Sequence, residues 1–347
     1  MIDDALARAL ATTCARHSGV SPGGQLSVCW GDGPQVDLAF GELAPGESAV
    51  TPAHWYDLAS LTKPLTAVAI ARAAARRGVT LDAPVTEVLP QLGADFSTVT
   101  PRLLLSHRAG LAAWAPLYTQ LHAASLGALI AAQGCAPSAA SRYSDLGYLL
   151  AGLWADRVFQ RDAAERIADE VTGPLGLAEL AMRPLDHGVS LGAIAPTERC
   201  EWRGRVVRGE VHDENAAALG GVAAHAGLFG TARAYARLGA ALCEAWHGRS
   251  HWLDGAILHE MLVAQAGGTH RVGFDTPNAE GASCGRAFGP ASFGHLGFTG
   301  TSLWVDPTRR LVVVLVTNRV HPSRENTAIR AFRPALHDAV VAALEDL

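Results

Sequence analysis

The sequence predicts an α/β fold of the α+β type. We expect an antiparallel sheet built from both termini and flanked by helices, with a helical region inserted between its strands. Alternating apolar residues occur near the two ends of the chain, whereas the residues between them follow helical spacing. With 347 residues and 49% hydrophobic content, the chain can bury a large core. We therefore expect a single catalytic domain over residues 1–347, with a sheet subdomain at about 1–60 and 265–347 and a helical subdomain at about 80–230.

The N-terminal elements follow directly from these patterns. Residues 2–17 have helical spacing, and residues 26–40 alternate on either side of a Gly-Asp-Gly-Pro turn, which predicts a hairpin. Residues 62–77 read as a strong amphipathic helix, with Pro64 in the first turn, where proline is tolerated.

The rest of the chain divides into helices and then strands. The predicted helices of the middle region are 99–107, 118–132, 146–159, 161–171, 231–246 and 254–265. The predicted C-terminal strands are 270–275, 291–297, 301–306 and 310–317, followed by a last helix over about 325–345.

Composition excludes several classes of protein. A net charge of −5 and a pI near 6.3 argue against nucleic acid as a partner. No apolar run approaches the roughly 20 residues of a membrane span. The acidic N-terminus does not resemble a signal peptide, so we expect a cytoplasmic protein, or a periplasmic one if a leader has been removed. Six scattered cysteines predict reduced thiols, and neither a metal nor an organic cofactor is expected. Nothing in the sequence indicates an oligomeric state.

The most informative residue is Lys63, the single lysine in a chain that has 27 arginines. It follows Ser60 by three residues at the start of a predicted helix, where residues i and i+3 share a face. A desolvated lysine can lose its proton and act as a base, whereas an arginine in a protein stays charged. The pair therefore fits a serine nucleophile activated by lysine, although a surface lysine that happens to follow a serine fits these residues equally well.

Two further elements accompany this pair. Ser60-x-x-Lys63 resembles the nucleophile motif of serine β-lactamases and penicillin-binding proteins. Tyr143-Ser144-Asp145 resembles the Tyr-x-Asn element of class C β-lactamases and related esterases, and implies that Tyr143 alternates with Lys63 in proton transfer. Such a tyrosine needs a pKa well below its usual value of about 10, which a nearby ammonium would supply. Asp145 replaces the usual Asn, which puts amide recognition there in doubt.

The third element is His295-Leu296-Gly297, which resembles the Lys/His-Thr-Gly strand of the same superfamily. The resemblance implies that His295 and Gly297 line the substrate site. It also implies that the N–H groups of Ser60 and Phe298 form an oxyanion hole. Leu296 replaces the usual threonine, and the lost hydroxyl makes efficient penicillin hydrolysis less expected. A histidine with a purely structural hydrogen bond is the alternative for His295.

Other segments extend the resemblance over roughly residues 50–320. They are 103–111 (LLLSHRAGL), 174–177 (PLGL) and 227–232 (GLFGTA). The loop from His212 to His225 resembles a segment of the branch that includes amidases acting on N-acetylmuramyl peptides. We expect His212, His225 and Asp145 to help select the substrate, while a self-hydrogen-bonded loop is the alternative.

The resemblance implies a serine hydrolase that cleaves an amide or ester through an acyl-enzyme on Ser60. A muramyl-peptide amidase, a D-amino-acid peptidase or carboxypeptidase, a short-chain esterase and a weak β-lactamase all use such a constellation. A small-molecule or peptide substrate is therefore expected. The alternative class is a penicillin- or peptide-binding sensor that keeps the fold without turnover.

Overall fold

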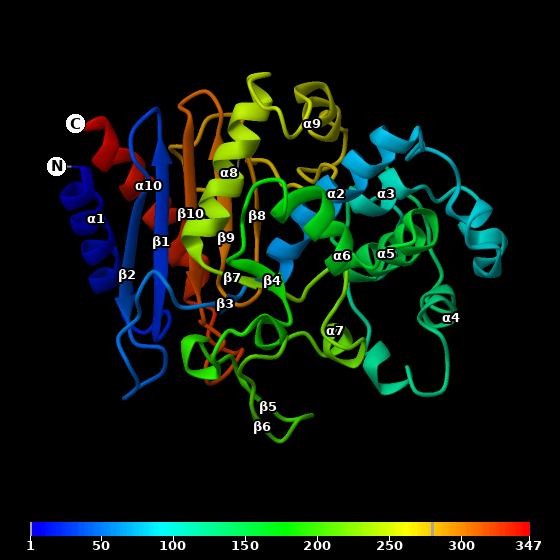
Figure 1. Cartoon of the computed structure of the whole chain (residues 1–347), viewed down its shortest axis with the longest axis horizontal. Helices are drawn as coiled ribbons and strands as arrows, with labels where there is room; N and C mark the ends of the chain where they lie inside the picture. The colour runs from blue at the N-terminus through cyan, green and yellow to red at the C-terminus, as the bar shows by residue number, and fades with distance from the viewer. Residues whose placement is uncertain (1, 279–280) are drawn as a thin grey trace.

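A five-stranded antiparallel sheet forms the body of the protein. The computed structural model describes residues 2–278 and 281–347, and Figure 1 shows the whole chain. Strand order in the sheet is β2-β1-β10-β9-β8. The strands are β1 (Gly23–Trp30), β2 (Val36–Gly41), β8 (Phe293–Leu296), β9 (Ser302–Asp306) and β10 (Leu311–Thr317). The expected sheet from both ends of the chain is confirmed.

Helices cover both faces of this sheet, which explains why the central strand β10 is apolar along its whole length. All seven residues of β10 are buried. Helix α8 (Ala232–Trp246) lies against one face, and the terminal helices α1 (Ile2–Arg16) and α10 (Ile329–Glu345) pack together on the other (Figure 1). A strand buried on both sides has no polar face, so its sequence is a continuous run of Val and Leu.

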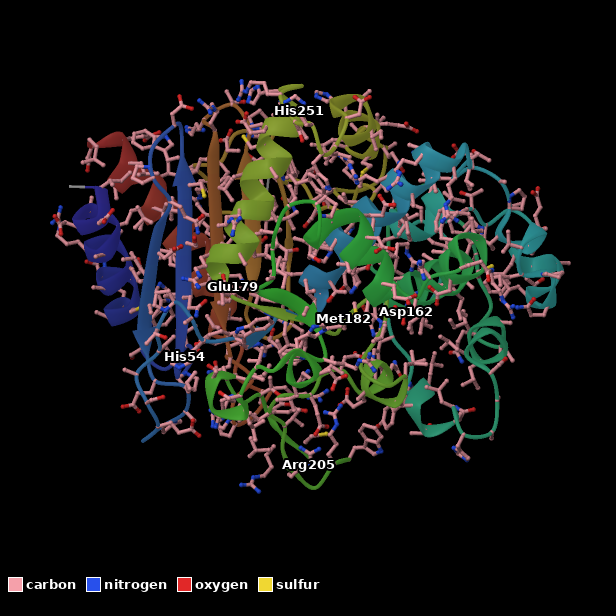
Figure 2. All side chains as sticks on the ribbon, in the orientation of Figure 1. His54, Asp162, Glu179, Met182, Arg205 and His251 are labelled. Carbon is pink, nitrogen blue, oxygen red and sulfur yellow. The ribbon has the colours of Figure 1, made fainter. Side chains whose placement is uncertain are left out.

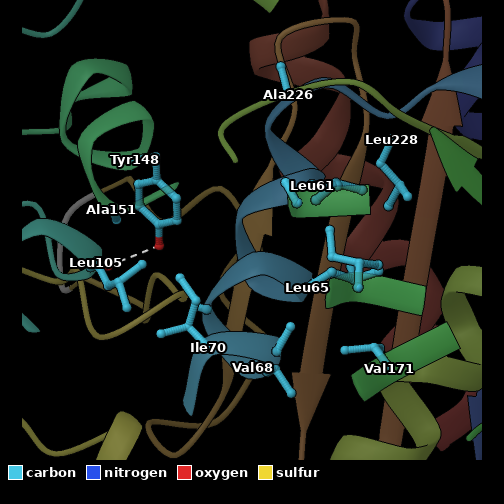
Figure 3. Packing of buried hydrophobic residues seen from close by; sticks show 14 of the residues in the cluster. Leu61, Leu65, Val68, Ile70, Leu105, Tyr148, Ala151, Val171, Ala226 and Leu228 are labelled. Carbon is cyan, nitrogen blue, oxygen red and sulfur yellow. Dashed lines mark hydrogen bonds between the residues drawn. The ribbon is translucent and has the colours of Figure 1, made fainter. Parts of the chain in front are cut away.

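Helix α2 (Thr62–Arg77) is the central helix of the helical region that lies beside the five-stranded sheet. It ends as predicted at Arg77, where Gly78 adopts the left-handed conformation of a C-cap. Figure 3 shows how the helix is surrounded: Ile70 faces Leu105 on one side, and Val68 points toward Val171 on the other. A helix enclosed on all sides gives the residues at its N-terminus a rigid support.

The helical region packs around α2 and carries most of the remaining helices. They are α3 (Pro101–Leu105), α4 (Leu126–Ala131), α5 (Asp145–Phe159), α6 (Ala163–Ile167), α7 (Glu214–Ala218) and α9 (Gly255–Met261). A π-helical turn over Ala168–Thr172 continues α6. No helix among the described residues is both long and apolar enough to cross a membrane.

Two predicted elements are wrong. The helix expected over 118–132 is only a 3-10 turn (Leu117–Thr119) followed by α4, because the side chain of Ser125 caps a new helix at the amide of Ala128. The strand expected over 270–275 does not form; one isolated bridge joins Asp275 to Gly294.

Several short strands were not predicted. They are β3 (Tyr56–Asp57), β4 (Leu180–Met182), β5 (Arg199–Cys200), β6 (Arg205–Val206) and β7 (Leu228–Gly230). The order β3-β7-β4 forms a small second sheet, and β5 pairs with β6 as a hairpin. Strands of two or three residues are too short to show an alternating pattern in the sequence.

Candidate active site

Ser60 lies in a 3-10 turn (Ala59–Leu61) that leads directly into α2. The residue before it, Ala59, has a φ of 48°, in the left-handed region that a non-glycine residue seldom adopts. The buried carboxylate of Asp57 accepts a hydrogen bond from the Ala59 N–H at 2.8 Å. This bond holds the strained turn and therefore fixes the direction of Ser60.

Lys63, the second residue of α2, is completely buried. Its Nζ lies 2.8 Å from Ser60 Oγ and 2.7 Å from Asp145 Oδ1, and it donates to the backbone carbonyl of His225 at 3.0 Å. Burial lowers the pKa of the Lys63 ammonium, and this effect outweighs the opposing influence of Asp145 and Asp213. The predicted contact between Ser60 and Lys63 is present in the structure.

Tyr143 completes the group, because its hydroxyl lies 2.7 Å from Ser60 Oγ. His107 holds the loop that carries it. The His107 carbonyl accepts from the Arg142 N–H at 2.8 Å, Nδ1 accepts from the Ser144 N–H at 3.0 Å, and the ring lies 4.6 Å from that of Tyr143. His107 belongs to the 103–111 segment that resembles the family, but the sequence did not predict its contacts with the Tyr143 loop.

The expected lowering of the Tyr143 pKa is wrong. Burial raises the pKa of Tyr143 well above its usual value, and the nearby Asp145 carboxylate raises it further. Lys63 lies 4.9 Å from the centre of the Tyr143 ring, yet its charge does not compensate for the lost solvation. Tyr143 is therefore a neutral phenol that can donate its proton.

Asp145 is the first residue of α5. Ser144 is the N-cap, since its Oγ accepts from the Gly147 N–H at 3.0 Å. This arrangement leaves the Asp145 carboxylate for the ion pair with Lys63. The substitution of Asp for Asn thus places a negative charge directly beside the lysine.

The segment after β8 is held close to the Ser60 turn by two threonines. Thr299 Oγ1 donates to the Asp57 carbonyl at 2.7 Å, and Thr301 Oγ1 donates to the Leu58 carbonyl at 3.0 Å. A Cβ at Gly297 would lie 1.9 Å from Thr301 Oγ1, so only glycine fits there. The Phe298 N–H donates to no acceptor within the described part of the chain. Its proximity to the Ser60 turn suits the predicted oxyanion hole.

His295 is buried at the edge of the site, with Nδ1 2.8 Å from the Leu296 carbonyl and its ring 6.2 Å from that of Tyr143. Burial, together with the charge of Lys63, lowers the pKa of His295 to about 3, so the ring is neutral. A cavity of about 310 Å³ opens beside it, lined by Ser60, Tyr143, His295, the 296–298 stretch and several arginines.

The two histidines expected to select the substrate do not line this cavity. His225 is buried behind Lys63, where its Nε2 lies 2.9 Å from Asp213 Oδ1. The backbone N–H of His212 donates to Asp57 at 2.6 Å, and its ring stacks on Phe298 with a centroid distance of 5.6 Å. His225 thus supports Lys63 through its backbone carbonyl, and His212 holds Asp57 and Phe298.

One cluster outside this group offers atoms suited to a cation. Carboxylate oxygens of Glu198 and Glu214 and the Cys200 sulfur lie within 4.8 Å of one another. Arg324 pairs with both carboxylates and already supplies their counter-charge. The six cysteines are all free.

Comparison with known proteins agrees with this geometry. The Beta-lactamase family matches residues 4–336, so the chain belongs to that family. A "Putative D-alanyl-D-alanine carboxypeptidase" of Escherichia coli strain K12 is 28% identical over 201 residues, which cover 53% of this chain and 46% of that protein. An "N-acetylmuramyl-L-alanine amidase" of Bacillus subtilis strain 168 is 29% identical over 195 residues, covering 52% and 44%. The chain thus aligns with less than half the length of these relatives.

The fold is shared with solved structures at lower identity. EstCE1, described as a hydrolase with promiscuous acyltransferase activity, superposes with a TM-score of 0.77 at 20% identity, covering 98% of this chain and 99% of EstCE1. This similarity extends over the sheet and the helical region together, and it concerns the fold alone.

Proposed function

We propose that this protein is a serine hydrolase that cleaves an amide or an ester through an acyl-enzyme on Ser60. The observation that carries the proposal is the arrangement of Lys63 Nζ and the Tyr143 hydroxyl, 2.8 and 2.7 Å from the same Ser60 oxygen. A nucleophile within hydrogen-bond reach of both a base and a proton donor is suited to acyl transfer.

Acylation begins with the neutral amine of Lys63 taking the proton of Ser60 as Oγ attacks the substrate carbonyl. The oxyanion that forms is held by the backbone N–H groups of Ser60 and Phe298. The neutral phenol of Tyr143 then donates its proton to the leaving amine or alcohol as the bond to the carbonyl carbon breaks. Lys63 returns a proton to Tyr143, and the acyl group remains on Ser60.

Deacylation uses Lys63 as the base again. A water molecule attacks the acyl carbonyl while its proton passes to the Lys63 amine, and Ser60 leaves as it recovers a proton. The products are a carboxylic acid and the free enzyme. Burial of Lys63 serves both steps, because it favours the neutral amine that can accept a proton.

As substrate we propose a peptide or muramyl amide derived from the cell wall, or a small ester. The relatives named as a carboxypeptidase and an amidase support the peptide class. The cavity supports a substrate that carries a carboxylate, since Arg330 lines it, is exposed and has no ion pair with any residue that the structure describes. Two other arginines of the cavity, Arg319 and Arg333, already donate to backbone carbonyls.

Hydrolysis of p-nitrophenyl butyrate and release of peptide from a muramyl peptide test the proposal. The wild type should hydrolyse at least one of them, and Ser60→Ala should hydrolyse neither. Activity that persists in Ser60→Ala would refute the role of Ser60. Failure of the wild type on both substrates would favour the non-catalytic binding module.

A further inference from the structure

Three aromatic side chains, two of them exposed, lie together near the segment that carries Asp145. Trp114 and Trp202 are 43% and 49% exposed, although large apolar side chains are usually buried. Tyr118 lies between them, with its ring 6.5 Å from that of Trp114 and 4.8 Å from that of Trp202. We call these three residues the aromatic platform. They come from two segments of the chain far apart in sequence, so the fold assembles the platform.

One end of the platform is fastened to the residues around Lys63. The Ala113 carbonyl, next to Trp114, accepts a hydrogen bond from the Asp145 N–H at 2.8 Å. The Tyr118 N–H donates to Asn215 Oδ1 at 2.8 Å, and Asn215 Nδ2 donates to the Ala115 carbonyl at 3.0 Å. A ligand on Trp114 would therefore lie close to the side of the site that holds Asp145.

The other end is carried by the β5–β6 hairpin, which lies at the lower edge of the molecule, where Figure 2 labels Arg205. Arg203 lies over the Trp202 ring at 5.1 Å and donates to the carbonyls of Val211 and His212 at 2.9 and 3.2 Å. The buried His212 ring stacks on Phe298, so Arg203 and His212 connect the hairpin to the segment that carries Phe298.

The chemistry of the platform suits a sugar ring better than an acyl chain. Exposed indole rings, with the half-buried Tyr118 between them, offer flat faces for the C–H groups of a pyranose. The charged side chains of Glu201 and Arg203 flank Trp202 and can meet hydroxyl and acetamido groups. An acyl chain would make no use of the exposed Glu201 carboxylate. An exposed apolar patch next to a catalytic group is typical of a ligand site.

We propose that the aromatic platform is a subsite for the pyranose ring of an N-acetylated amino sugar. This inference rests on the proposed function, and it narrows the substrate to sugar-bearing peptides such as muramyl peptides. The platform would hold the sugar while the amide or ester lies at Ser60.

Calorimetric titration of the Ser60→Ala protein tests this subsite with two ligands. One is an N-acetylmuramyl dipeptide, and the other is the same dipeptide with an N-acetyl group in place of the sugar. We expect the sugar-bearing ligand to bind about tenfold more tightly, which corresponds to about 1.4 kcal/mol. Trp202→Ala and Trp114→Ala should each remove most of that difference, while Trp202→Phe should keep part of it. Leu191→Ala truncates an exposed apolar side chain outside the platform and should change neither affinity.

Equal affinities for the two ligands would overturn the proposal. It would also be overturned if the tryptophan variants, shown to be folded by circular dichroism, weakened both ligands equally, because the platform would then bind the peptide. Hydrolysis of p-nitrophenyl butyrate by the wild type tests the proposed hydrolase function separately from the sugar subsite. An active esterase without a preference for the sugar would contradict the subsite alone.

Discussion

Three oxygen atoms surround the Nζ atom of Lys63, and a neutral amine can meet all three with two N–H groups and one lone pair. Two N–H groups can serve Asp145 and the His225 carbonyl, which leaves the lone pair directed at the Ser60 hydroxyl. A guanidinium has five donors and no basic lone pair, so an arginine cannot take this position. The need for a base at this one site explains why a chain that otherwise uses arginine has a lysine here.

Lys63→Arg should therefore be almost as inactive as Lys63→Ala. We expect kcat/KM on p-nitrophenyl butyrate to fall by about 10²–10⁴, the usual contribution of a general base. The control is Arg8→Lys on the exposed surface of α1, which should keep full activity. Activity of Lys63→Arg within tenfold of the wild type would contradict the role of Lys63 as a base.

The charge of Asp145 leads to a second prediction, about pH. Asp145 raises the pKa of Lys63 and so opposes formation of the neutral amine. Asp145→Asn removes this charge, so the pKa of Lys63 should fall and the acid limb of the kcat/KM profile should move to lower pH. The measurement is the pH dependence of ester hydrolysis by both proteins. A limb that stays in place or moves to higher pH would contradict the assignment of that limb to Lys63.

These residues could be predicted from the sequence because the chemistry fixes their types and, for Ser60 and Lys63, their spacing. The direction of the Tyr143 pKa could not be predicted. It depends on burial, which is produced by segments remote in sequence such as that of His107. For the same reason the ring positions of His212 and His225, behind the catalytic group, were not foreseen.

At the scale of elements, three segments meet at Asp57 in strand β3. Its carboxylate accepts from the N–H groups of Ala59 and His212, and its carbonyl accepts from Thr299. Burial raises the pKa of Asp57, and no side-chain cation pairs with it among the described residues. Asp57 thus joins the Ser60 turn, the His212 loop and the segment that carries Phe298.

Asp57→Asn should disturb all three segments while keeping the size of the side chain. Its amide can accept one of the two N–H groups but would face the other with its own N–H. We expect the free energy of unfolding to fall by about 1–3 kcal/mol, the usual cost of a buried donor left without a partner. Because Ser60 would lose its alignment, kcat should fall more than KM changes. Asp95→Asn, an exposed carboxylate, is the control. A fully active and equally stable Asp57→Asn would show that Asp57 positions nothing.

The long elements were predictable because their burial creates a pattern. Helix α2 and strand β10 are each enclosed by other elements, and each is long enough for its run of apolar residues to stand out in the sequence. The short strands β3 and β7 have no such pattern, yet they hold Asp57 and pair beside the site. Their formation depends on contacts that only the folded chain provides.

On the scale of the whole molecule, several histidines are buried as neutral rings. Burial lowers the pKa of His337 and of His295 to about 3. In the unfolded chain these rings take up protons below a pKa of about 6.5. Their contribution to stability is therefore present above pH 6.5 and is lost as the pH falls toward 3.

We expect the free energy of unfolding to fall steeply below pH 6.5, by about 1.4 kcal/mol per pH unit for each such histidine. His337→Gln should reduce that slope by about this amount, because the variant has no ring to protonate at this position. The comparison is urea unfolding of both proteins between pH 7 and pH 5, with exposed His122→Gln as the control. An unchanged slope in His337→Gln would contradict a neutral His337 in the folded protein.

The central claim is that Ser60 is a nucleophile activated by Lys63. Its most direct test is the intact mass of the protein after incubation with a fluorophosphonate probe, followed by peptide mapping. We predict one adduct on the wild type, located at Ser60, and none on Ser60→Ala under the same conditions. An unlabelled wild type, or equal labelling of Ser60→Ala, would contradict the claim.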